Sequence, residues 1–135
     1  MMKKIIIVVM LFATFFSCKN EMKEELKPIV ENSEATEIQL IQFHTEHRCV
    51  TCNNIEKLSK ETIKDNGAIS FVLYNVDDEK NAKVAEQFEA TGTSLYLYNS
   101  KTKATKDLTE MAFMYAKNEG EKFKTELQKE ISEFK

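Results

Sequence analysis

The sequence predicts a single α/β domain whose elements follow the order strand, helix, strand, helix, strand, strand, helix. Two short apolar runs are each followed by a helical pattern, and short apolar runs with apolar residues on both faces are typical of covered strands. Four apolar residues at helical spacing close the chain. Its length of 135 residues suits one hydrophobic core rather than two.

The first half of the domain follows from this pattern. Residues 37–44 are apolar toward both faces and predict a covered central strand. A polar turn over residues 45–48 leads to a helix over residues 49–66, which Gly67 closes. The apolar side of this helix carries Cys52, Ile55, Leu58, Ser59 and Thr62 or Ile63.

The second half begins with a strand over residues 69–76. Residues 77–79 provide a cap and an acidic first turn for a helix that ends at Gly92. Residues 95–98, a turn at 99–101 and residues 103–108 predict a hairpin with an exposed edge strand. We expect an apolar group to pack on the sheet before the last helix: Met111, Phe113, Met114 and Tyr115. That last helix is marked by Phe123, Leu127, Ile131 and Phe134.

The N-terminal region has the features of an export signal. Two lysines precede twelve mostly apolar residues, 5–16, a run too short to span a bilayer. Ser17 followed by Cys18 resembles the processing site of bacterial lipoproteins, which implies that Cys18 is lipidated. We therefore expect residues 1–17 to be a signal peptide, 18–36 a lipidated flexible tether and 37–135 the folded domain. This predicts a membrane-anchored lipoprotein of the bacterial cell envelope, facing the periplasm or the cell surface.

Composition argues against two classes of ligand. The three glycines, Gly67, Gly92 and Gly120, are too far apart to form a glycine-rich phosphate loop, so we expect no nucleotide. The net charge of -3 offers no basic surface for nucleic acid.

The chemistry lies in a Cys-x-x-Cys pair, Cys49 and Cys52, at the join between the first strand and the first helix. A sulfur at a helix N-terminus faces unpaired N–H groups, so its thiolate is favoured. Cys49 is therefore predicted to be the nucleophile. Cys52 lies one turn further along, on the side facing the core, and is predicted to resolve a mixed disulfide.

Charged neighbours modify this prediction. Arg48 adds a cation next to Cys49, whereas Glu46 opposes it. His44 and His47 favour the thiolate when charged. His44 ends a buried strand and is expected to be a packed core residue rather than a ligand.

The element order, with Cys-x-x-Cys after the first strand, resembles the thioredoxin fold family over residues 37–134. This implies a central mixed four-stranded sheet flanked by helices. The motif from Phe43 to Glu56, the later Asn75-Val76-Asp77 and the final helix are similar to the bacterial nitrophenyl compound nitroreductase subunit ArsF family. No flavin site is visible, so we carry over the thiol chemistry without the nitro substrate and expect no cofactor.

Three positions depart from the thioredoxin pattern that this resemblance implies. Ser94 stands where the family has a cis-proline, Arg48 replaces a tryptophan, and Gln42 replaces a buried acid. Disulfide reduction is then expected to be slow or narrow in substrate. Acid or base assistance would have to come from His44, His47 or Glu46.

The sequence thus predicts an envelope thiol–disulfide oxidoreductase whose partner is a protein thiol or disulfide or an envelope electron donor. The same two cysteines leave alternatives open: a zinc site, an inert disulfide, or a carrier of a soft ion such as Cu(I).

Overall fold

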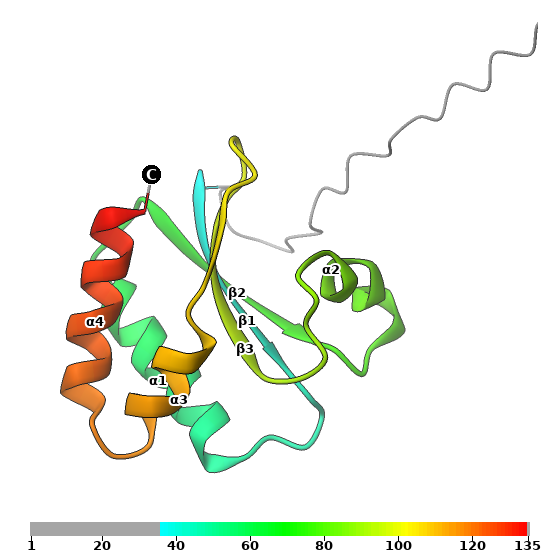
Figure 1. The fold of residues 1–135 in the computed structure, drawn as a ribbon, viewed down its shortest axis with the longest axis horizontal. Helices are drawn as coiled ribbons and strands as arrows, with labels where there is room; N and C mark the ends of the chain where they lie inside the picture. The colour runs from blue at the N-terminus through cyan, green and yellow to red at the C-terminus, as the bar shows by residue number, and fades with distance from the viewer. Residues whose placement is uncertain (1–35, 135) are drawn as a thin grey trace, which may run out of the picture.

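A computed structural model describes residues 36–134 (Figure 1). Its strands are β1 (Ile38–His44), β2 (Ile69–Asn75), β3 (Ser94–Asn99) and β4 (Thr105–Asp107). Its helices are α1 (Val50–Ile63), the short 3-10 helix η1 (Glu79–Asn81), α2 (Ala82–Gln87), α3 (Thr109–Ala116) and α4 (Gly120–Glu133). Within this part of the chain, no helix has the length and apolar character needed to cross a membrane.

The four strands form one mixed sheet in the order β2-β1-β3-β4. β1 pairs with β2 in parallel and with β3 in antiparallel orientation, so Ile41 lies between Val72 and Tyr96. β4 pairs only with the outer side of β3 and is largely exposed, as expected for an edge strand. The predicted α/β class with a central mixed sheet is confirmed.

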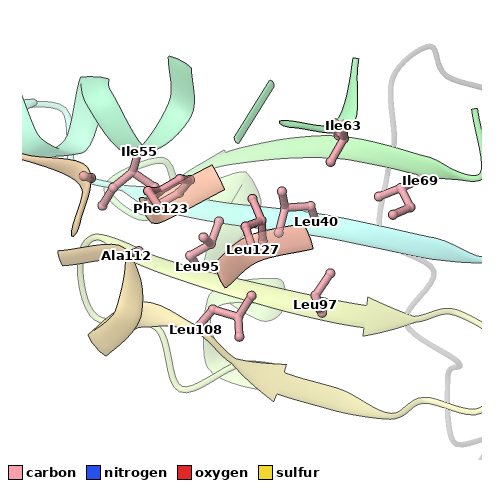
Figure 2. Close-up of a cluster of buried hydrophobic side chains, with 11 residues drawn as sticks. Leu40, Ile55, Ile63, Ile69, Leu95, Leu97, Leu108, Ala112, Phe123 and Leu127 are labelled. Atoms are coloured by element: carbon pink, nitrogen blue, oxygen red, sulfur yellow. The ribbon is translucent and has the colours of Figure 1, made fainter. Parts of the chain in front are cut away.

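Helices cover both faces of the sheet (Figure 1). On one face, α1, α3 and α4 bury a cluster that includes Leu40, Leu95, Leu97, Phe123 and Leu127, with the neighbouring side chains drawn in Figure 2. On the other face, Ile41, Phe43, Tyr98 and, from the α2 segment, Ala85 and Phe88 form a second, aromatic-rich cluster. Because successive strand residues point to opposite faces, β1 supplies both clusters and is buried from Gln39 to Phe43.

Helix α3 was absent from the predicted order. The region expected to pack as an apolar group is an eight-residue helix that rests on Ala112 and Ala116. Phe113 and Met114 are exposed, so the expectation of packing was wrong for these two, whereas Met111 and Tyr115 pack against the buried cluster as expected. Ala112 and Ala116 are the buried residues of α3, which leaves Phe113 and Met114 on its outer side.

The predicted helix ends were also wrong. α1 ends at Ile63 and α2 at Gln87, each before the glycine that was expected to close it. After α2, Glu89 takes the left-handed conformation with φ of 52°. The N–H of Ala90 donates to the Ala85 carbonyl at 2.8 Å, and that of Glu89 donates to Glu86 at 3.0 Å. These two bonds form a Schellman cap with glutamate at the position that glycine usually takes.

Candidate functional site

Cys49 caps helix α1. The backbone of Cys49 is extended, with φ of -79° and ψ of 165°, and its Sγ accepts a hydrogen bond from the Cys52 N–H at 3.3 Å. This N–H is one of the first amides of the helix, which have no partner within the helix itself. The side chain of Cys49 is exposed. The sulfur therefore sits where backbone donors favour its negatively charged form.

The second sulfur lies directly behind the first. The two Sγ atoms are 2.7 Å apart and both cysteines are free. A disulfide bond is about 2.05 Å long, so a small movement joins them. Cys52 is only 4% exposed, as its helical spacing predicted. Hydrogen bonds from the Cys52 thiol and then from the Cys52 backbone N–H hold the pKa of Cys49 below its usual value.

A hydroxyl that the sequence analysis did not select completes the surroundings of Cys52. Thr93 Oγ1 lies 3.1 Å from Cys52 Sγ, at hydrogen-bond distance. Ser94, which was expected to support the site, is buried at the start of β3, and its hydroxyl donates to the Gly92 carbonyl at 3.4 Å. The position of Ser94 relative to the family's proline was the signal that could have identified its neighbour Thr93.

Gln42 lies beneath the first turn of α1. Its side chain is fully buried in the middle of β1, and Nε2 donates to the Cys52 carbonyl at 3.0 Å. Its other polar atom, Oε1, is buried without a hydrogen-bond partner. A neutral amide therefore links the central strand to the helical turn that carries the buried cysteine.

Arg48, the residue before Cys49 in the chain, is paired with an acidic side chain of α1. Its Nη2 lies 2.6 Å from Glu56 Oε2, and Lys60 Nζ lies 2.5 Å from the other oxygen of the same carboxylate. Arg48 Nε and Nη2 are both shielded from solvent and lack an aligned hydrogen-bond acceptor, so the contact with Glu56 is an ion pair rather than a well-formed hydrogen bond. Burial raises the pKa of Glu56, but Lys60 and Arg48 outweigh it and hold that pKa below its usual value.

The remaining predicted residues stay in the loop that precedes the helix. Glu46 and His47 are exposed, and the Glu46 N–H donates to Asp77 Oδ2 at 2.7 Å. His44 is half-buried at the end of β1, with Nδ1 2.8 Å from the Thr45 carbonyl oxygen, so it is not the packed core residue that was expected. Among the described residues, the hydrogen bonds of both sulfurs run to each other, to the α1 backbone and to Thr93.

Comparison with known proteins gives a fold but no family. No family model matches the chain, and no curated protein matches it. Among solved structures, thioredoxin from Fasciola hepatica superposes with a TM-score of 0.50 at 19% identity, over 73% of this chain and 82% of that one. The fold is thioredoxin-like. A structure described as a malarial protein aligns at 22% identity with a TM-score of 0.42, over 59% of this chain and 94% of its own.

This thioredoxin-like domain places two thiols of unequal exposure at one strand–helix join. Among residues 36–134, no three histidine, cysteine or acidic side chains are grouped so as to hold a metal ion. The two sulfurs thus meet no third ligand of these types from the described chain. What the arrangement can do is release a pair of electrons by closing one S–S bond and accept a pair by opening it.

Proposed function

We propose that this chain is a thiol–disulfide oxidoreductase of the bacterial cell envelope that acts through Cys49 and Cys52. The observation that carries the proposal is the exposed, helix-capping sulfur of Cys49, with its lowered pKa, 2.7 Å from the buried sulfur of Cys52. A thiolate is the form of cysteine that attacks disulfides, and a second sulfur within reach lets the protein release its partner.

The reduced pair acts on a partner disulfide in two steps. The Cys49 thiolate attacks one sulfur of the partner, that S–S bond breaks, and the departing thiolate takes up a proton. Cys52 then loses its proton and attacks the Cys49 sulfur, so the mixed disulfide breaks and the second partner thiol leaves. Two electrons have passed to the partner, and the pair has become a disulfide. The reverse sequence oxidises a partner dithiol.

Neighbouring groups fit these roles. Thr93 Oγ1 can donate to Cys52 Sγ as that sulfur becomes charged. Gln42 cannot take up a proton, and Cys49 is bonded to the partner at this step, so the proton of Cys52 must leave to solvent or to the departing partner thiolate. We propose a protein thiol or disulfide, or an envelope electron donor, as the partner.

The attachment to the envelope is proposed from the sequence alone, because residues 1–35 lie outside the described part of the chain. The lysines, the short apolar run and Ser17-Cys18 support a cleaved signal peptide and a lipid on Cys18. Replacing Cys18 with serine should release the protein from membranes or leave an unprocessed precursor. Wild-type protein that stays soluble with an unmodified Cys18 would contradict the anchor.

Membership of the nitrophenyl compound nitroreductase subunit ArsF family is likewise our proposal. It is supported by the motif around the cysteine pair, His47-Arg48-Cys49-Val50-Thr51-Cys52 with Glu56. The proposed activity is thiol exchange and does not include a nitro compound.

Titration in glutathione redox buffers tests the proposed function. The fraction of linked Cys49–Cys52 is read by alkylation and peptide mass, which separates these cysteines from Cys18. We expect one reversible two-electron transition. A Cys52→Ser variant should accumulate mixed disulfides that the matched Cys49→Ser variant does not form. Absence of the transition, together with tight binding of Cu(I) or Zn(II) by the reduced protein, would replace this function with metal carriage.

A further inference from the structure

The ion pair between Arg48 and Glu56 bridges the loop before α1 to the second turn of that helix. Both side chains are mostly shielded, at 24% and 19% exposed, so the pair is screened less than a surface contact. Arg48 is the residue next to Cys49, yet its guanidinium is neutralised by a carboxylate. The proposed thiol exchange makes no use of this carboxylate.

We propose that Glu56 is a positioning residue that holds and neutralises Arg48, and thereby sets how strongly the reduced Cys49–Cys52 pair is favoured over its disulfide. The inference rests on the proposed function, because it concerns the same pair of sulfurs. Glu56 acts on the sulfurs through Arg48, since no hydrogen bond among the described residues joins Glu56 to either sulfur.

The sign follows from the charges. The thiolate form of reduced Cys49 carries a negative charge that the neutral disulfide lacks, so added positive charge nearby stabilises the reduced form and makes the pair more oxidising. Glu56 is bound by two cations, Arg48 and Lys60. Replacing it with glutamine removes the one negative charge of this group, while an amide of nearly the same shape stays beside Arg48. The positive charge of Arg48, the residue before Cys49 in the chain, is then unmasked.

The test compares Glu56→Gln with Glu61→Gln in the full chain. Glu61 is a matched control because it lies on the same helix and is also paired with a lysine, Lys124, at 3.2 Å. At 1.5 Å per residue, Glu61 is about 18 Å along the axis from Cys49 and Glu56 about 10 Å. We expect Glu56→Gln to favour the reduced pair about threefold against glutathione, about 14 mV for two electrons, and Glu61→Gln to leave it unchanged.

A second variant gives the opposite sign. Arg48→Gln removes the cation and should favour the disulfide, and the double variant with Glu56→Gln should return toward the wild type. These opposite shifts separate the proposal from a loss of stability, which would not move the potential in both directions. Equal potentials for Glu56→Gln and Glu61→Gln, in protein that folds, would overturn it.

The alkylation rate of Cys49 against pH provides a readout that needs no redox couple. Its midpoint should move to lower pH by about half a pH unit in Glu56→Gln, the same threefold effect on the thiolate. If the wild type has no reversible couple, the proposed function fails, but this midpoint still decides whether Glu56 acts on Cys49. An unmoved midpoint would refute the role of Glu56 even if the redox couple is present.

Discussion

Replacing Gln42 with methionine should leave the protein as stable or make it more stable. Gln42 is fully buried, donates one hydrogen bond at 3.0 Å to the Cys52 carbonyl, and leaves Oε1 without a partner. Methionine has a similar length and shape but no polar hydrogen-bonding amide. The Cys52 carbonyl lies inside α1, where the helix supplies its own N–H donor.

The magnitude comes from two opposing terms. Losing the hydrogen bond costs about 0.5–1.5 kcal/mol, whereas removing a buried unpartnered oxygen gains about 1–3 kcal/mol. The difference is a stabilisation of about 1 kcal/mol, which raises the melting temperature by roughly 4–8 °C for a domain of this size.

Urea unfolding of the reduced full chain measures this difference. Gln42→Ala removes the same amide but leaves a cavity, so it should be less stable than Gln42→Met by about 2 kcal/mol or more. The comparison separates packing from hydrogen bonding. A methionine variant destabilised by more than about 1.5 kcal/mol would show that Oε1 has a partner in solution, and the reasoning would be wrong.

Three further outcomes are expected. The pKa of Cys49 is lowered in the folded protein, so its alkylation rate should rise at a pH below the ordinary pKa of about 8.5. Reduced native protein should also gain stability over the unfolded chain as the pH rises from the lowered pKa of Cys49 to this ordinary value. Unfolding in urea should move the alkylation midpoint up to that value, and an equal midpoint in both states would contradict the cap. Thr93→Val should slow the release of a mixed disulfide about fivefold, because it removes a hydrogen bond to Cys52 worth about 1 kcal/mol, while Thr93→Ser keeps the wild-type rate. Equal release rates for both variants would exclude a role of the hydroxyl. Leu127→Ala should cost about 2–5 kcal/mol in urea unfolding without changing the alkylation of Cys49 in folded protein, and a loss below 1 kcal/mol would argue against the buried position of this side chain.

The cysteine site could be predicted in outline because it depends on local periodicity. A strand that ends at His44 and a helix that starts at Val50 leave Cys49 at the helix N-terminus. The spacing of three residues then turns Cys52 toward Ile55 and the core, where it is buried. Both positions follow from chain geometry within a few residues.

The sequence could not predict the interactions that depend on the tertiary arrangement. The apolar residues of α3 surround the helix, so they show no helical period, and its exposed Phe113 and Met114 look like core residues in the sequence. The ion pair of Arg48 with Glu56 joins residues on either side of the cysteine pair, and the sequence predicted the cation next to Cys49 but not the carboxylate that pairs with it. Thr93 reaches Cys52 only because β3 pairs beside β1.

The position of β1 at the centre of the sheet has a consequence for how the domain folds. Both of its neighbours, β2 and β3, come later in the chain, and the antiparallel partner of Ile38 is Asn99. Pairing between strands that are far apart in the sequence is slow, because the entropy of closing the intervening loop is lost before the stabilising contacts form. A nascent or truncated chain that ends before Ser94 exposes one unpaired edge of β1, a strand that is buried from Gln39 to Phe43 in the folded domain, and this edge is open to intermolecular association. The cysteine pair is synthesised early, but its final surroundings form only when the third strand has arrived.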